Sequence, residues 1–258
     1  MQLASVALLL TTLPLAQAEL AAPNGAGVAM GHVHLNVKNI DASRQFFVNL
    51  GGTAVKNGAL EMIEFPGMYF VLRSQEPSGP TTDSTVNHVG FLVKDVLASV
   101  AKWKSLGLRV EPGLGPTNFN VFTPEGAKIE IIEDKTLATP MRFHHIHYFL
   151  PDPIAAQTWY AKMFGAAPGK RGPYDAADIP GVNLTFQKVD TMQTAIKGRA
   201  IDHIGFEVKD LAAICSKVEA EGVPVDRRNS SSPTLKIAYL TDPWGTYIEL
   251  TQGLPPLR

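Results

Sequence analysis

One short pattern recurs four times along the chain and constrains its fold more than any other feature. Each copy is a strand-like stretch of alternating residues that starts near a histidine: His32, His88, His145 and His203. Successive histidines are separated by 56, 57 and 58 residues. A period this regular, with one polar residue kept in phase, is typical of an internal repeat. The sequence therefore predicts four copies of one unit, with the function located where the histidines meet.

Each copy predicts the same order of elements, which is one strand, one helix and three further strands. In the first copy the helix is expected over residues 44–50, because Gly51-Gly52 ends the helical pattern. The corresponding helices are expected at 96–106, 154–164 and 211–221. The fold class is then α+β, built from four βαβββ modules.

Segments rich in Pro, Ser, Gly and Thr separate the modules, and one of them, over residues 134–142, divides the chain into halves. We expect an N-terminal domain over residues 29–134 and a C-terminal domain over residues 142–252. Composition supports this, because 45% of the residues are hydrophobic and can form a core. The net charge of −1 gives no indication of a nucleic-acid partner.

The first residues resemble a secretory signal peptide and not part of the fold. The run 3–15 is apolar, and Ala16-Gln17-Ala18 matches a cleavage site, so residues 1–18 are expected to be removed. The alternative is a disordered or lipid-facing tail. The prediction is a secreted or periplasmic protein with no membrane partner after cleavage. The single cysteine, Cys215, excludes an intramolecular disulfide.

Strand alternation predicts which side chains share a face with the histidines. In the fourth copy Ile204, Phe206 and Val208 form the apolar face, so His203 points the other way. By the same reasoning His147 shares the face of His145. A face that carries histidines is expected to line a cavity or to contact solvent.

Two glutamates lie in phase with this polar face. Glu249 and Glu130 each follow a turn glycine by four residues, whereas Val71 and Thr185 stand at the equivalent positions of the odd modules. Each half then offers two histidines and one carboxylate, a set that leaves coordination positions open for a catalytic metal. The expected sets are His32, His88 and Glu130 in the N-terminal half, and His145, His203 and Glu249 in the C-terminal half. The alternative is a repeated strand start whose histidines form local hydrogen bonds.

These modules, with the run from Tyr239 to Leu250 (YLTDPWGTYIEL), resemble the vicinal oxygen chelate superfamily over about residues 31–252. The superfamily includes glyoxalase I, fosfomycin and bleomycin resistance proteins, and extradiol ring-cleaving dioxygenases. The resemblance implies that modules pair into two cup-shaped mixed sheets. It also implies that the metal ligands come from the first and last strands of modules.

The spacing from Tyr239 to Glu249 is similar to the C-terminal signature of extradiol dioxygenases. The resemblance implies that Tyr239 donates a hydrogen bond to a substrate oxygen, although a packed aromatic ring is the alternative. The acid–base histidine of that family has no counterpart in residues 230–236, and His147 is a candidate replacement. An intact ligand set in the first half also departs from those dioxygenases. Glyoxalase I usually has four protein ligands, one more than each set here.

Three functions fit these observations. The first is a metal-dependent enzyme that acts on a small oxygenated molecule. Dioxygenase-like chemistry with Fe(II) is favoured, and the alternative is a glyoxalase-like lyase or isomerase with Mn(II), Zn(II) or Ni(II). The second is a protein that sequesters a ligand without turnover, as bleomycin-resistance proteins do. The third is an exported interaction domain that keeps the cup without its chemistry.

Overall fold

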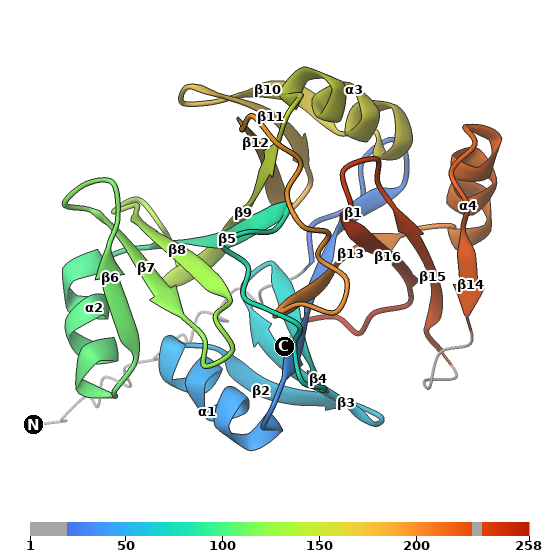
Figure 1. Ribbon diagram of the computed structural model, residues 1–258. Coiled ribbons are helices and arrows are strands. Elements are labelled where there is room, and N and C mark those ends of the chain that lie inside the picture. The colour runs from blue at the N-terminus through green and yellow to red at the C-terminus, as the bar shows by residue number, and fades with distance from the viewer. Residues whose placement is uncertain (1–19, 229–233, 258) are drawn as a thin grey trace, which may run out of the picture.

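The computed structural model describes residues 20–228 and 234–257 (Figure 1). The predicted signal peptide, residues 1–18, lies outside these residues, so its assignment stays a prediction. Two eight-stranded mixed sheets and four helices make up the described fold, which confirms the α+β class. Among the described residues no helix is both long and apolar enough to cross a membrane.

The N-terminal half contains the first two modules, each in the predicted order. Module one consists of β1 (Val28–Val37), α1 (Ile40–Leu50), β2 (Thr53–Asn57), β3 (Leu60–Phe65) and β4 (Met68–Ser74). Module two consists of β5 (Val86–Val93), α2 (Val96–Ser105), β6 (Arg109–Pro112), β7 (Asn118–Phe122) and β8 (Lys128–Glu133).

The C-terminal half repeats the same order twice. Module three consists of β9 (Met141–Leu150), α3 (Pro153–Phe164), β10 (Ala167–Arg171), β11 (Tyr174–Ile179) and β12 (Val182–Lys188). Module four consists of β13 (Ile201–Val208), α4 (Leu211–Ala220), β14 (Asp226–Arg228), β15 (Lys236–Thr241) and β16 (Tyr247–Gln252).

All four helices start in the same way. A short polar side chain just before the helix accepts a hydrogen bond from a backbone N–H of the first turn, which satisfies one of the unpaired donors at a helix start. These N-cap residues are Asn39, Asp95, Asp152 and Asp210. In the first module we expected the helix over residues 44–50, but it begins earlier, at Ile40, and Asn39 caps it.

The modules combine in an order that the sequence did not reveal. One sheet has the strand order β14-β15-β16-β13-β1-β4-β3-β2, so it joins module four to module one. The other has the order β10-β11-β12-β9-β5-β8-β7-β6, so it joins module three to module two. The expectation that each half of the chain forms its own ligand set is therefore wrong, because the first strands that pair come from opposite halves.

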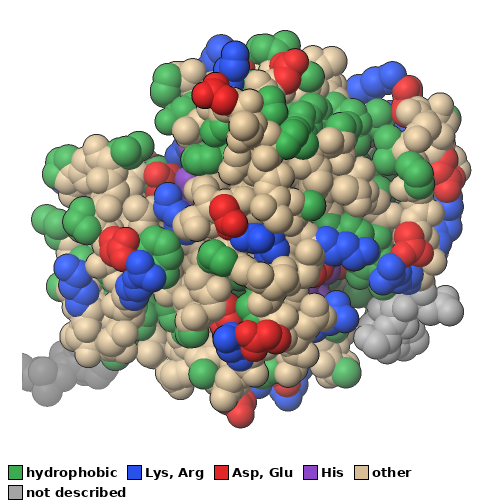
Figure 2. Space-filling model, in the orientation of Figure 1, with side chains coloured by type: hydrophobic (Ala, Val, Ile, Leu, Met, Phe, Trp, Pro, Cys, Tyr) green, Lys and Arg blue, Asp and Glu red, His purple; other side chains and the backbone are tan. Residues whose placement is uncertain are grey.

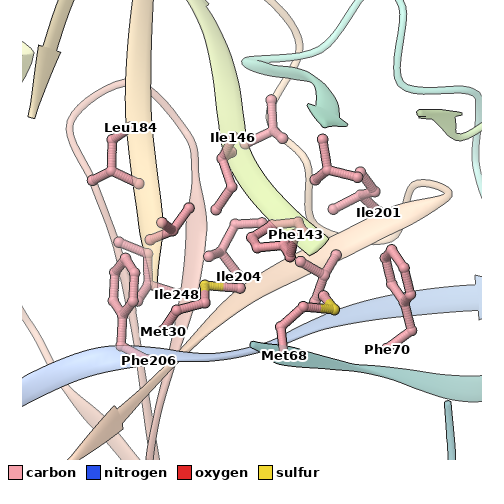
Figure 3. Packing of buried hydrophobic residues seen from close by; sticks show 14 of the residues in the cluster. Met30, Met68, Phe70, Phe143, Ile146, Leu184, Ile201, Ile204, Phe206 and Ile248 are labelled. Atoms are coloured by element: carbon pink, nitrogen blue, oxygen red, sulfur yellow. The ribbon is translucent and has the colours of Figure 1, made fainter. Parts of the chain in front are cut away.

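The apolar faces of both sheets contribute to one core. Figure 3 shows Met30 and Phe206 of the first sheet near Ile146 and Leu184 of the second, and all four belong to one buried cluster. Since the apolar faces meet here and under the helices, the histidine-bearing faces are left to form two separate sites. Cys215 is buried in α4, as its helical pattern predicted.

This topology predicts that the halves do not fold alone. Residues 141–257 contain β9 and β13, but the strands that pair with them, β5 and β1, are in the other half. We expect the isolated C-terminal half to aggregate or to self-associate through these open edges, since unpaired strand edges associate readily. Co-expression with residues 20–140 should give a one-to-one complex, as judged by size-exclusion chromatography. A monomeric C-terminal half with a cooperative unfolding transition would contradict the prediction.

Candidate functional site

Two clusters of buried histidines lie where first strands from opposite halves pair. We name them by one histidine each. The His203 cup contains His32, His34, His203 and Glu249, whose ligand atoms all lie within 4.8 Å of one another. The His88 cup contains His88, His145 and His147 within the same limit, together with Glu130 beside two of them. In Figure 2 histidine appears only as small purple patches, in keeping with this burial.

The His203 cup converges on one carboxylate oxygen. His203 Nε2 lies 2.7 Å and His32 Nε2 lies 3.0 Å from the same Oε2 of Glu249. His34 completes the group, with its ring centroid 4.3 Å from that of His203. Strand pairing produces this arrangement, because β1 places His34 opposite His203, and β16 places Glu249 beside Gly205.

The His88 cup repeats this arrangement with one added cation. His145 Nε2 lies 3.0 Å and His88 Nε2 lies 3.7 Å from Oε2 of Glu130. The guanidinium of Arg171 lies 3.5 Å from the same oxygen. His147 Nδ1 lies 3.2 Å from His88 Nε2, because β5 places these two histidines opposite each other.

The structure therefore redistributes the six predicted ligands. His32 joins His203 and Glu249, and His145 joins His88 and Glu130, so the two odd-module histidines exchange partners relative to the expected sets. The physical reason is that antiparallel pairing of first strands, and not proximity in sequence, decides which modules share a sheet.

The residue before each even-module histidine fixes the orientation of that imidazole. Asp202 Oδ1 lies 2.6 Å from His203 Nδ1, and Asn87 Oδ1 lies 2.9 Å from His88 Nδ1. Asp202 is itself held by Asn36 Nδ2, which donates to Oδ2 at 3.1 Å. A fixed Nδ1 leaves Nε2 to face the cluster, as metal-bound histidines are commonly oriented.

Electrostatics keep most of these imidazoles neutral. Burial, with some help from neighbouring histidines and Arg171, lowers the pKa of His145 to about 3 and that of His147 to about 2. Although burial by itself lowers it, hydrogen bonds to Asp202 and Glu249 raise the pKa of His203. Burial opposes ionisation of Glu249, but hydrogen bonds from His203 and His32 hold its pKa well below its usual value.

The donor sets fit a divalent metal ion. Two ligands that bind one metal at about 2.1 Å lie roughly 3 Å apart, and the histidine–glutamate distances of 2.7–3.7 Å fall around this value. Among the described residues, the buried Nε2 atoms of His34 and His147 have no hydrogen-bond partner. Neutral imidazole is also the form that binds metals. Both cups could therefore hold an ion through nitrogen and oxygen ligands.

The C-terminal residues pack against the strand that lies beside β1 of the His203 cup. Leu257 is fully buried against Met62, Tyr69 and Val71, and the last two lie beside His32 and His34 on the same face. Tyr69 donates a hydrogen bond to the carbonyl of Pro255 at 3.1 Å. Figure 1 also places the C-terminal end next to β4.

Glu207 anchors this C-terminal segment on the other side. Its Oε1 accepts from the backbone N–H groups of Gly253 at 2.7 Å and Leu254 at 3.3 Å. The C-terminal segment is therefore held by hydrogen bonds as well as by apolar contacts.

The His88 cup, in contrast, opens into a pocket of about 640 Å³. The pocket wall includes His88, His147 and Glu130, so the metal-binding atoms are reachable from it. Two cations, Arg171 and Lys128, also line it. A small molecule can approach this cluster, and the excess of cations favours an anion.

The two residues expected to act in catalysis lie in different cups. Tyr239 belongs to the His203 cup, where its ring is 5.5 Å from that of His203 and is stacked on Tyr247 at 5.1 Å. His147 belongs to the His88 cup, where its ring lies 5.0 Å from Tyr174. Asn120 occupies the position in the His88 cup that Tyr239 occupies in the other.

The sequence analysis did not identify the two pocket cations or the contacts of the C-terminal residues. Arg171 ends β10 and Lys128 begins β8, and neither carries a motif of its own. Asp202 and Asn87 had a detectable signal, since each directly precedes a repeat histidine of an even module. Residues 254–257 carry no such signal, and only the fold shows that Leu257 packs on Tyr69 and Val71 of β4.

Comparison with known proteins shows one matching family model and several solved structures with a similar fold. Residues 142–250 match the model of the Glyoxalase/Bleomycin resistance protein/Dioxygenase superfamily. Glyoxalase I from Zea mays superposes with a TM-score of 0.69 at 17% identity, covering 88% of this chain and 92% of that one. A putative dioxygenase from Bacillus subtilis gives a TM-score of 0.64 at 15% identity, covering 92% and 87%. None of the curated proteins matches the chain significantly. These likenesses show the fold.

Two glycines make room for the histidine rings, and this gives a stability prediction. A Cβ on Gly205 would lie 2.0 Å from the ring of His32. Gly205→Ala is therefore expected to displace His32 and to lower the free energy of unfolding by about 1–3 kcal/mol, the usual cost of overpacking. Urea denaturation measures the change. Gly169→Ala is the control, because a Cβ there meets no atom within 4 Å; equal stability losses in both variants would contradict the prediction.

Proposed function

We propose that this protein is a metal-dependent enzyme, because residues 142–250 match the model of the Glyoxalase/Bleomycin resistance protein/Dioxygenase superfamily and the chain shares the fold of glyoxalase I from Zea mays. We place its reaction in the His88 cup. Its substrate would be a small, anionic organic molecule with two neighbouring oxygen atoms.

The observation that carries the proposal is a convergent ligand set at the wall of an open pocket. His88, His147 and Glu130 line the pocket. Ligand pockets of a few hundred Å³ with a small number of convergent polar groups are the usual sites for small molecules. A purely structural metal site would need no such access.

The pocket wall would bind and orient the substrate. Lys128 is half-buried, and this burial lowers its pKa, although the nearby Glu130 acts in the opposite direction. Arg171 faces Glu130 at 3.5 Å, so a carboxylate on the substrate would gain two cationic partners beside the cluster. A metal bound there would polarise the substrate's adjacent oxygens and stabilise negative charge that develops on them.

The separation of Tyr239 from His147 bears on the type of reaction. Dioxygenase-like chemistry, which the sequence favoured, would use a tyrosine and an acid–base histidine at one metal. Here Tyr239 is stacked on Tyr247 in the His203 cup, while His147 lies in the His88 cup, which opens into the pocket. We therefore favour the lyase or isomerase alternative over oxygen insertion. Sequestration of a ligand without turnover remains the competing function, and it requires the pocket but not the complete ligand set.

Metal content tests the first part of the proposal. Protein purified without chelator is expected to carry about two ions per chain, measured by mass spectrometry, with Mn(II), Fe(II), Zn(II) or Ni(II) as candidates. His88→Ala and His203→Ala should each remove one ion, because each histidine serves a different cup. If no ion is retained even after reconstitution with each metal, the enzyme proposal fails and the search moves to metal-free ligand binding.

Oxalate, a small dianion with adjacent oxygens, tests the pocket. Titration of the Mn(II)-loaded protein followed by electron paramagnetic resonance should show oxalate binding. Lys128→Gln should weaken this binding about tenfold, since a hydrogen bond to a charged group contributes roughly 1.5–3 kcal/mol. Lys170→Gln is the matched control, because Lys170 is exposed and paired with Asp175. Equal affinities in the two variants would count against Lys128 as a substrate contact.

A further inference from the structure

We propose that the second histidine of each His-X-His strand is a fourth metal ligand: His147 in the His88 cup and His34 in the His203 cup. Each would replace the carboxylate that the odd modules lack on their last strand. This inference rests on the metal-dependent function proposed above and specifies how many protein groups hold the ion.

Strand register in the His203 cup shows how one ligand can stand in for another. In module four Glu249 on the last strand lies directly beside Gly205 on the first strand. In module one the equivalent pair is Val71 on the last strand beside His34 on the first. Each pair thus presents one metal-binding side chain and one that cannot bind, but the two modules carry the ligand on different strands.

The His88 cup contains the same exchange. Glu130 lies beside Gly90 in module two, and Thr185 lies beside His147 in module three. The exchange therefore occurs independently in both sheets. Because neighbouring residues on adjacent strands project from the same face about 5 Å apart, either strand can reach the same centre. The glycine is needed in the even modules, since a Cβ on Gly90 would lie 1.8 Å from the ring of His145.

Distances and unused hydrogen-bonding capacity support a ligand role. His147 Nδ1 lies 3.2 Å from His88 Nε2, which is the spacing of two neighbouring ligands on one metal. In the His203 cup, Nε2 of His34 is buried and has no hydrogen-bond partner among the described residues. Buried polar atoms without partners are costly, so a role that uses them has to be sought.

A fourth protein ligand would limit the reactions that a metal ion in the His88 cup could support. An octahedral ion with three protein ligands has three open positions, enough for a bidentate substrate and for molecular oxygen. With four protein ligands only two positions remain, and a substrate that chelates through two neighbouring oxygens fills both. The additional histidine thus agrees with a lyase or isomerase more than with an oxygenase.

The experiment compares two neighbouring histidines of β9. His203→Ala protein serves as the background, so that only the His88 cup binds metal. In this background His147→Ala should weaken Co(II) affinity, measured by chelator competition, by about 100-fold or more. His144→Ala is the matched control: His144 contacts only Nδ1 of His145, at 3.1 Å, and loss of such an outer partner typically costs 10–100-fold.

The number of metal-bound imidazoles gives a second readout. This number would not change if His147 had only a structural role. The proton NMR spectrum of the Co(II)-loaded background should show hyperfine-shifted signals from three imidazoles. His147→Ala should reduce them to two, whereas His144→Ala should keep three. His147→Gly combined with Thr185→Glu copies the Gly90–Glu130 arrangement, so it should restore affinity to within about tenfold of the background.

Three outcomes would overturn the inference. The first is a background spectrum with only two shifted imidazoles, and the second is equal affinity loss in His147→Ala and His144→Ala. The third is failure of the glycine–glutamate exchange to recover binding in a variant whose circular dichroism shows it to be folded. Complete absence of metal binding in the unmodified protein would instead refute the proposed function as well, so the two failures can be told apart.

Discussion

Antiparallel pairing between the first strands of modules from opposite halves is the interaction on which the rest of the structure depends. β1 pairs with β13 and β5 pairs with β9, and each pair forms the centre of an eight-stranded sheet. Every group in the two clusters lies on these four strands or on the last strand beside one of them. The same pairing directs the apolar faces into a shared core and leaves the histidine faces to form cups (Figure 3).

The two cups contain similar clusters, but their surroundings differ. In the His203 cup Tyr239 and Tyr247 stack beside His203, and the C-terminal residues pack on Tyr69 and Val71. In the His88 cup Asn120 and Lys128 occupy the positions of the two tyrosines, and a pocket opens there. One chain could thus hold two ions in different surroundings.

Much of the fold was readable from local patterns. The helices predicted at 154–164 and 211–221 are observed as Pro153–Phe164 and Leu211–Ala220. These succeed because caps, turn glycines and alternation act over a few residues. The phase of the six candidate ligands within each module is also local, and all six side chains lie in the two clusters. Their grouping failed because each cluster forms where strands from opposite halves of the chain pair, such as β1 and β13, and no local signal indicates that pairing.

The sequence by itself determined the repeated module, the face on which each histidine lies and the supply of carboxylates only in even modules. It did so because strand alternation is a property of the backbone and needs no knowledge of the partner. Only the tertiary structure decided which modules share a sheet, which cup is open, and that His34 and His147 lie within ligand distance of the other groups. Those features depend on strand register and on the path of the C-terminal residues, and both are set by packing across the whole chain.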